Sequence, residues 1–326
     1  MIITYAQAIS SALEEEMGRD KQLTLIGEDI GQYEGVFKAT KGLFKKFGPD
    51  RVKDTPISEQ AIIGAAIGTA LLGYRVVAEI MYIDFATLAS DQIINYAAKI
   101  HYMSGGKQVV PIVIRTQQGA GIRNAGQHSQ SLEAWYAHIP GLKVLAPSTP
   151  YNAKGLLKAA IRDDNPVLFI EHKKLYKTKG EVPDQDYLVE IGKADVKREG
   201  GFLTIIAYSR MVSVAEEVSD ILYEKYGKQC EVIDLQSISP IDADTVVNSV
   251  KKTGNAAVLH EACTSYGAGG EISSIIQEQA FDWLDSPVLR IGAPDTIVPF
   301  SSVLEDSFIP SPQTVLEKIT SHFGLE

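Results

Sequence analysis

The chain has 326 residues, of which 45% are hydrophobic and 22% are charged, and its formal net charge is -10 at pH 7. This length is sufficient for two domains that each bury a core. The acidic balance argues against nucleic acid or an anionic membrane as a partner, because no basic block offsets it.

The first half of the chain alternates helices with short apolar strands. In chain order the pattern predicts helix 4–18, strand 23–27, a short helix at 44–47, helix 60–72, strand 74–80, helix 85–102, strand 109–115, strand 143–146, helix 152–161 and strand 167–171. Strands separated by helices of this length form a parallel sheet covered on both faces. The predicted fold class is therefore α/β.

A polar stretch at 174–200, interrupted by Gly180 and Pro183, is the expected linker. The alternation then resumes, with strands at 203–208, 230–235, 256–260 and 288–291 and helices at 211–226, 242–253 and 269–280. We expect two domains, at residues 1–185 and 186–326. The second has no glycine-rich phosphate loop, which favours a scaffold or docking role.

Cysteine content and the absence of targeting signals indicate a soluble protein of a reducing compartment, the cytoplasm. Cys230 and Cys263 are far apart and each adjoins a strand, which predicts free thiols and neither a disulfide framework nor a zinc site. The segment Met1–Ala6 lacks the pattern of a secretory signal, and no apolar run reaches membrane-spanning length.

Glu59 is the first candidate for chemistry, because it stands just before an apolar helix. A carboxylate at the mouth of such a helix is partly desolvated and suited to hold or share a proton. The alternative is structural: Ser58 would cap the helix and Glu59 would interact with the positive end of its dipole. Taken alone, the segment Asp54–Glu59 favours capping.

Two further segments offer functional side chains. Strand 74–80 runs into Glu79–Phe85, and ligands bind where parallel strands end. There Phe85 offers an aromatic face and Met81 a soft apolar contact, although core packing explains a single aromatic equally well. His128 stands in a polar loop after Gly119 and Gly121, where it is either a proton donor or a structural hydrogen-bonding residue.

Five segments match a known family when they are taken together: Arg51–Glu59, Ala98–Gly106, Gln127–Ser131, Pro140–Val144 and Ala160–Pro166. Over its full length the chain resembles the beta subunit of the E1 component of 2-oxo acid dehydrogenase complexes, which are thiamine-diphosphate enzymes. The resemblance implies a parallel-sheet pyrimidine-binding domain followed by a transketolase C-terminal-like α/β domain. It also implies an oxidoreductase that decarboxylates a 2-oxo acid and transfers the acyl group to the lipoyl domain of E2.

The resemblance assigns roles residue by residue. Glu59 matches the acid that hydrogen-bonds N1′ of the cofactor's aminopyrimidine, and His128 matches a histidine on the substrate side. Phe85 matches the aromatic that stacks on the pyrimidine, and Met81 and Ile57 line the same pocket. Glu28 and Asp91 match acids between paired active sites. A potassium ion in relatives is held, mostly through backbone carbonyls, at positions matching Ile112, Ala160, Ile161, Asp163 and Asn165, although Arg162–Pro166 also suits an ordinary turn.

One expected motif is missing. Related enzymes hold the diphosphate through magnesium with a Gly-Asp-Gly segment and a later asparagine, whereas the nearest approach here is Gly27–Asp29. We therefore expect an E1 alpha subunit to supply magnesium and the diphosphate site in an alpha2beta2 heterotetramer. The second domain is expected to dock on the peripheral-subunit-binding domain of E2, with Asp295 and Glu305 as candidate contacts.

The substrate stays open within the family. Pyruvate ranks first, but acetoin cleavage and branched-chain 2-oxo acid decarboxylation use the same beta-subunit chemistry, and Phe300–Asp306 and Gln127–Ser131 also resemble acetoin-type subunits. A non-catalytic assembly subunit is the alternative of another class. The joint presence of Glu59, Phe85 and His128 argues against it.

Overall fold

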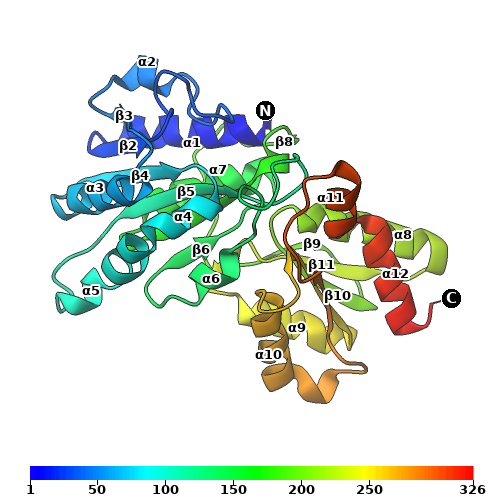
Figure 1. Ribbon diagram of the computed structural model, residues 1–326. Helices are drawn as coiled ribbons and strands as arrows, with labels where there is room; N and C mark the ends of the chain where they lie inside the picture. Colours follow the sequence, from blue (N-terminus) through cyan, green and yellow to red (C-terminus); the bar gives the residue numbers. More distant parts are fainter. Residues whose placement is uncertain (326) are drawn as a thin grey trace. The chain divides into compact units, whose positions relative to one another are not determined.

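The computed structural model describes residues 1–325, which form two compact units (Figure 1). The first unit comprises Met1–Gln118 and Trp135–Ile191, and the second comprises Gly119–Ala134 together with the chain from Gly192 onward. The segment Gly119–Ala134, which contains His128, therefore groups with the second unit. The boundary expected between residues 185 and 186 stays a prediction.

The first unit is built on a parallel sheet, as expected. Its strands follow the spatial order β6-β7-β5-β4-β2-β3, and every neighbouring pair is parallel. Their bounds are β2 Leu23–Gly27, β3 Val52–Asp54, β4 Arg75–Ile80, β5 Ile112–Gln118, β6 Lys143–Leu145 and β7 Val167–His172. All residues of β5 and β7 are buried, as befits central strands covered on both faces.

Helices of the first unit pack on this sheet and on one another. They are α1 Tyr5–Arg19, α2 Leu43–Phe47, α3 Glu59–Leu71, α4 Ile83–Ala86, α5 Ile100–Met103 and α7 Pro150–Arg162, together with α6 Glu133–Ala137, whose first two residues belong to the second unit. Helix α1 begins with a capping box, in which Thr4 accepts from the backbone N–H of Gln7 and the Gln7 side chain accepts from that of Thr4. It packs against α7, so its apolar stripe joins the core.

The single helix expected at 85–102 is wrong. The segment is broken into α4, the 3-10 turn η1 (Thr87–Ala89), the π-helix η2 (Gln92–Ala97) and α5. The backbone N–H of Ala98 donates to the carbonyl of Ile93 at 3.1 Å, a bond five residues back that widens the turn. Such wide turns often occur at functional sites.

The polar stretch 174–200 is more structured than a linker. Residues Lys179–Glu181 form β8, which pairs antiparallel with β1 (Ile2–Thr4) at the start of the chain. Lys173–Leu175 form the 3-10 turn η3, and Asp195–Arg198 form β9. Pairing between such distant three-residue strands leaves no periodic signal in the sequence, which explains why it was not predicted.

The second unit carries a five-stranded sheet in the order β14-β13-β10-β11-β9, in which only the edge strand β9 is antiparallel. The other strands are β10 Leu203–Ala207, β11 Cys230–Asp234, β13 Ala256–Cys263 and β14 Leu289–Ala293, with a short β12 at Ser237–Ser239. The helices are α8 Met211–Tyr226, α9 Ala243–Thr253, α10 Gly269–Ala280, α11 Ser302–Phe308 and α12 Pro312–Phe323, and η4 spans Phe281–Trp283.

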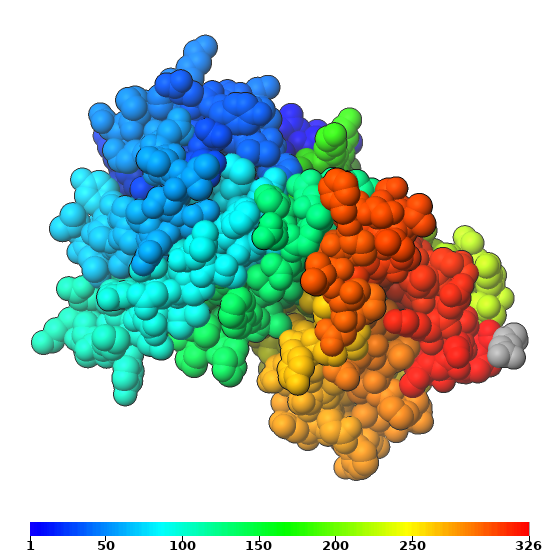
Figure 2. Space-filling model, in the orientation of Figure 1, coloured from blue at the N-terminus to red at the C-terminus, as the bar shows by residue number. Residues whose placement is uncertain are grey.

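Two further properties concern apolar helices and the apolar surface. In residues 1–325 no helix combines the length and apolar character needed to cross a membrane. Several large apolar side chains between Ile297 and Leu304 are exposed on the second unit, and Figure 2 shows this part of the chain in orange-red on the visible surface.

Candidate functional site

Glu59 is the first residue of α3 and is half-buried. Ser58 occupies the N-cap position, but its side chain makes no capping hydrogen bond, so the expected serine cap is wrong. The helix start therefore leaves Glu59 near the positive end of the dipole without a side chain that satisfies the first-turn amides. Ile57, expected to line the cofactor pocket, is 74% exposed in this chain.

Glu28 lies close to Glu59 at the end of β2. The pKa of the Glu28 carboxyl is raised, first by burial and then by the negative charges of Asp29 and Glu59. The end of β3 secures this arrangement. There the Asp54 carboxylate accepts the backbone N–H of Gly31 at 2.6 Å and that of Gln32 at 3.1 Å, which fixes the loop after Glu28. Two predicted site acids are thus brought together.

Phe85 is half-buried and belongs to the short helix α4, which follows β4 directly. Tyr82 precedes α4 in the left-handed region with φ of 69°, and its backbone N–H donates to Oε1 of Gln117 at 3.1 Å. The Tyr82 ring meets Phe85 edge-on, with centroids 6.3 Å apart. Met81, the other predicted contact, is half-buried immediately before Tyr82.

A buried ionic network supports the ends of β4, β5 and β7, and sequence analysis did not identify it. Arg115 is fully buried, donates to both oxygens of Glu171 at 2.6 and 2.8 Å, and donates to Glu79 at 2.7 Å. Tyr176 also donates to Glu171, and Gln117 donates to Glu79 at 3.2 Å. A charged residue inside each of three otherwise largely apolar strands (Glu79, Arg115 and Glu171) was the signal that could have found it.

Burial has opposite consequences for the acid and the base of this network. It raises the pKa of Glu79, an effect that Arg115 opposes and the charge of Glu171 reinforces. Burial alone would lower the pKa of Arg115, but the charges of Glu171 and Glu79 outweigh it and hold that pKa above its ordinary value. Because Gln117 joins Glu79 to the backbone of Tyr82, the network supports the segment that carries Phe85.

His128 is half-buried in a loop of the second unit. The loop turns through Gly119, Gly121, Arg123 and Ala125, all with positive φ. Its ends meet where the N–H of Gly119 donates to the carbonyl of Gln130 at 3.2 Å. The structure therefore groups Glu28, Glu59, Met81 and Phe85 in the first unit and His128 in the second.

The residues expected to hold potassium gather around the end of α7. Arg75 donates to the carbonyls of Ile161 at 3.0 Å and Asp163 at 2.7 Å, so these two oxygens converge on one point. A carbonyl oxygen has a second lone pair, which leaves each able to ligate a cation. The Asp163 carboxylate forms an ion pair with Lys143 and accepts a hydrogen bond from Asn165. The positive charges of Arg75 and Lys143 reduce the attraction of this site for a further cation.

Ile112 and Ala160 are buried, whereas Asn165 is exposed. The carbonyl oxygens that the structure brings together here, those of Ile161 and Asp163, both accept hydrogen bonds from Arg75. For divalent metals, residues 1–325 contain no group of three histidine, cysteine, aspartate or glutamate residues able to hold an ion.

The remaining predicted acids, Asp295, Glu305 and Asp91, differ in their exposure to solvent. Asp295 is exposed, but Glu305 is fully buried, so Glu305 cannot contact a docking partner and that expectation is wrong. Asp91 is exposed and accepts from the side chain of Asn95 at 2.7 Å.

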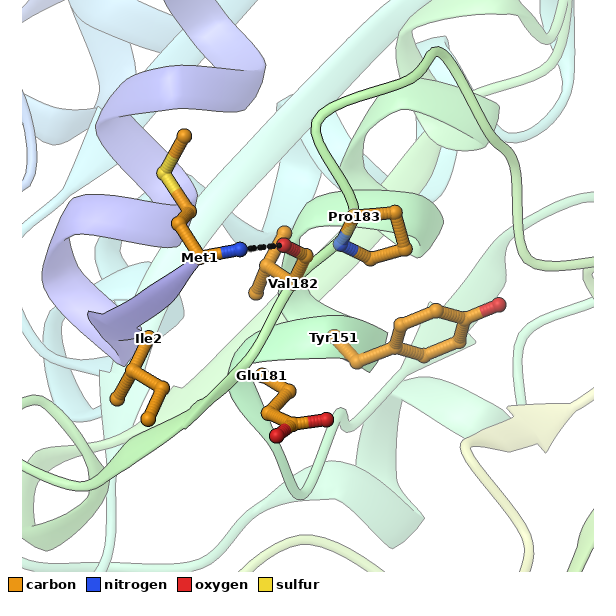
Figure 3. Close-up of a pocket in the computed structure, with 6 residues that line it drawn as sticks. All are labelled: Met1, Ile2, Tyr151, Glu181, Val182 and Pro183. Carbon is orange, nitrogen blue, oxygen red and sulfur yellow. Dashed lines mark hydrogen bonds between the residues drawn. The ribbon is translucent and has the colours of Figure 1, made fainter.

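A separate hollow of about 630 Å³ lies in the first unit (Figure 3). It is lined by Met1, Ile2, Tyr151, Glu181, Val182 and Pro183. The amine of Met1 donates to the carbonyl of Val182 at 2.8 Å, as the dashed line shows. None of the predicted site residues lines it, so we do not assign the chemistry there.

Comparison with known proteins matches both halves of the chain. Residues 2–179 match the pyrimidine-binding domain of transketolase, and residues 192–315 match its C-terminal domain. A solved structure described as a split gene transketolase, an inactive beta4 tetramer, is similar over 99% of both chains with a TM-score of 0.81 and 23% identity. That likeness confirms the predicted two-domain α/β fold.

Curated relatives are similar over nearly the whole chain. The mitochondrial pyruvate dehydrogenase E1 component subunit beta of Dictyostelium discoideum is 47% identical, covering 96% of this chain and 89% of its own length. In Bacillus subtilis (strain 168), a 2-oxoisovalerate dehydrogenase subunit beta is 45% identical, covering 96% of both. An acetoin:2,6-dichlorophenolindophenol oxidoreductase subunit beta from the same organism is 44% identical, covering 97% and 95%.

Proposed function

Because the chain belongs to the family of E1 beta subunits of 2-oxo acid dehydrogenase complexes, we propose that it decarboxylates a 2-oxo acid together with an alpha subunit. The expected substrate is pyruvate, with transfer of the acyl group to the lipoyl domain of E2. The observation that carries the proposal is that Glu28, at the end of β2, and Glu59, at the start of α3, lie close together in the part of the chain that matches the pyrimidine-binding domain. Membership of this family makes the chain a subunit of an oxidoreductase that depends on thiamine diphosphate.

Glu59 is the proposed catalytic acid. Thiamine diphosphate, when bound, supplies the nucleophilic carbon and the electron sink for decarboxylation. From the start of α3, Glu59 would hold and share a proton at N1′ of the aminopyrimidine. Glu28, which lies close to Glu59 and has a raised pKa, is proposed as a second carboxyl with which that proton can be exchanged.

Phe85 and Met81 are the proposed apolar contacts for the pyrimidine ring. The support of α4 through Tyr82 and Gln117 holds Phe85 at the end of β4, where parallel-sheet proteins bind ligands. Ile57 is proposed to complete this lining. Its exposure in the single chain fits a side chain that becomes covered once cofactor and partner are bound.

A partner subunit is proposed to complete the site. The sequence has no Gly-Asp-Gly motif, so Mg²⁺ and the diphosphate require the alpha subunit. The segment 85–103 presents four exposed apolar side chains suited to contact with a partner: Leu88, Tyr96, Tyr102 and Met103. The proposed assembly is an alpha2beta2 heterotetramer in the cytoplasm, with Glu28 and Asp91 on the path between its paired sites.

The acyl-transfer side of the reaction is assigned to the second unit. His128 is proposed to act near the substrate and to assist transfer to the lipoyl group. Exposed Asp295 is the proposed contact for the peripheral-subunit-binding domain of E2. A potassium ion is proposed at the carbonyls of Ile161 and Asp163, with Ile112, Ala160 and Asn165 as further ligands.

Substrate choice is tested by assaying the heterotetramer, assembled with its alpha partner, on pyruvate, acetoin and branched 2-oxo acids. The relatives of all three classes are 44–47% identical, so similarity alone does not separate them. Preference for pyruvate supports the proposal, whereas preference for acetoin or a branched acid moves the chain to that subgroup. Inactivity on all three favours the non-catalytic assembly subunit.

A further inference from the structure

Two buried carboxylates of the second unit accept hydrogen bonds from the backbone of the loop that carries His128. Glu261 on β13 accepts the backbone N–H of Ala120 at 2.6 Å. Glu305 on α11 accepts the N–H of Gly121 at 2.7 Å and that of Arg123 at 3.2 Å. Both acceptors lie far from the loop in the sequence: Glu261 is 141 positions after Ala120, and Glu305 is 184 positions after Gly121. We call Glu261 and Glu305 the carboxylate clamp.

Glu305 is the stronger half of the clamp. It is fully buried, and the guanidinium of Arg123 covers it with a hydrogen bond of 2.6 Å. Gly121 and Arg123 both have positive φ, and successive amides in such a turn form a concave site for an anion. The carboxylate fills that site, so it compensates a backbone shape that a non-glycine residue such as Arg123 rarely adopts.

Charges around the clamp are nearly balanced. Arg123 pairs with Glu305 and also with exposed Asp306 at 2.8 Å, and Arg210 approaches Glu261 at 3.3 Å. The hydrogen bonds that Arg123 donates to Asp306 and Glu305 raise the pKa of its guanidinium above the ordinary value. Arg123 therefore stays protonated and closes the outer side of the turn.

Space also restricts the loop. A Cβ atom placed on Gly126 would come within 2.6 Å of the Ile297 side chain, so the loop lies directly against the segment that precedes α11. Two residues further on, the N–H of His128 donates to the carbonyl of Ala125 at 3.3 Å. Hydrogen bonds thus hold the backbone N–H groups of Ala120, Gly121, Arg123 and His128.

We propose that Glu261 and Glu305 are positioning residues that set the place of His128 for acyl transfer. This inference rests on the proposed function of His128. It gives the second unit a part in the reaction beyond docking. The clamp acts on the loop and not on the pyrimidine contacts, since Glu59, Met81 and Phe85 belong to the first unit.

Glu305→Gln in the assembled heterotetramer tests the proposal. Glutamine keeps the size of the side chain but turns one acceptor into a donor that faces the Gly121 and Arg123 amides. We expect faster amide exchange across residues 119–130 and a kcat for the complete reaction that falls about tenfold to a hundredfold, with KM for thiamine diphosphate unchanged. Asp306→Asn is the matched control: it removes a charge from the same arginine but contacts no loop amide, and both readouts should stay at wild-type values.

The outcomes separate this inference from the function on which it rests. If Glu305→Gln matches Asp306→Asn in both readouts, or loosens the loop without lowering kcat while His128→Ala is impaired, the positioning role is wrong. Full activity of His128→Ala instead overturns the role proposed for His128. If Glu305→Gln does not assemble, Arg123→Gln carries the same comparison. In the wild type the amides of Gly121 and Arg123 should exchange slowly, and rapid exchange of both would overturn the clamp without any variant.

Discussion

Glu28 and Glu59 come from different elements, the end of β2 and the start of α3, yet the negative charge of Glu59 helps to raise the pKa of Glu28. After burial and Asp29, it is the third contribution to that rise. Two carboxyl groups that lie this close together can share one proton. For the proton role proposed for Glu59, this relationship connects the end of β2 with the start of α3.

Replacement of Glu59 tests the proton role directly. Glu59→Gln should lower decarboxylation in the heterotetramer by roughly 100- to 10,000-fold, because glutamine cannot hold an exchangeable proton for N1′. Assembly, followed by size-exclusion chromatography, should be unaffected, since the side chain is only half-buried. Glu28→Gln is the comparison and should have the smaller effect. A Glu59→Gln rate near that of the wild type would show that the proton comes from elsewhere.

The divided cofactor site makes a prediction for the chain by itself. Titration calorimetry of the isolated subunit with thiamine diphosphate and Mg²⁺ should show negligible binding, because no carboxylate cluster in residues 1–325 can hold the metal. Addition of the alpha subunit should restore tight binding. Tight magnesium-dependent binding by this chain alone would contradict the shared site.

Arg115 should be indispensable for the stability of the first unit. Arg115→Met leaves the buried acids Glu79 and Glu171 without their cation, which costs about 3–5 kcal/mol in the free energy of unfolding. Chemical denaturation measures the loss. Arg198→Met removes an exposed ion pair with Asp220 and should cost less than about 1 kcal/mol. Equal midpoints for the two variants would show that the network contributes little.

His260 predicts how stability depends on pH. It is fully buried, and burial, aided by Arg290, lowers its pKa to about 4, although its bond to the Ala262 carbonyl opposes the shift. The unfolded chain binds a proton near pH 6.5 and the folded one does not, so stability is complete above that pH and is lost as pH falls toward 4. The loss reaches roughly 3 kcal/mol.

His260→Gln is the variant for this measurement. Urea titrations across the acidic range give the unfolding free energies of the wild type and the variant. Their difference separates the contribution of His260 to the pH dependence from that of the many carboxylates. We expect the difference to favour the wild type near neutral pH and to shrink through this window. A difference that is constant with pH would mean that the imidazole takes up its proton equally well in both states.

Potassium should stabilise the end of α7. Replacing potassium by choline at equal ionic strength should lower the Tm, because the Ile161 and Asp163 carbonyls would lose one of their two partners and keep only Arg75. Sodium serves as the control for ion size. Identical Tm values in all three salts would show that the guanidinium alone satisfies these oxygens.

Periodicity was sufficient to predict the main strands and the long helices of both units except α12, for which no helix was expected. The parallel sheet needs runs such as those of β4 and β7, whose apolar residues are adjacent in the chain. Two other failures share a cause. The π-turn at η2 and the β1–β8 pair depend on hydrogen bonds whose partners no local pattern specifies.

The candidate site was predictable in its residue types more than in its geometry. Family resemblance located Glu59, Phe85 and His128, but the Arg115 network depends on three strands being neighbours. The association of the His128 loop with Glu305 depends on a contact across 184 positions. Ser58 looked like a cap because of its residue type, whereas its backbone conformation prevents the bond.

The clamp on the His128 loop also fixes an order of events during synthesis. Gly121 leaves the ribosome long before Glu305, which lies 184 residues later and is the acceptor of its backbone N–H. The nascent chain can form the sheet of its first unit while this loop still has no anchor. Translation must continue into α11 before the loop can settle, so a prematurely terminated chain carries the histidine without its support.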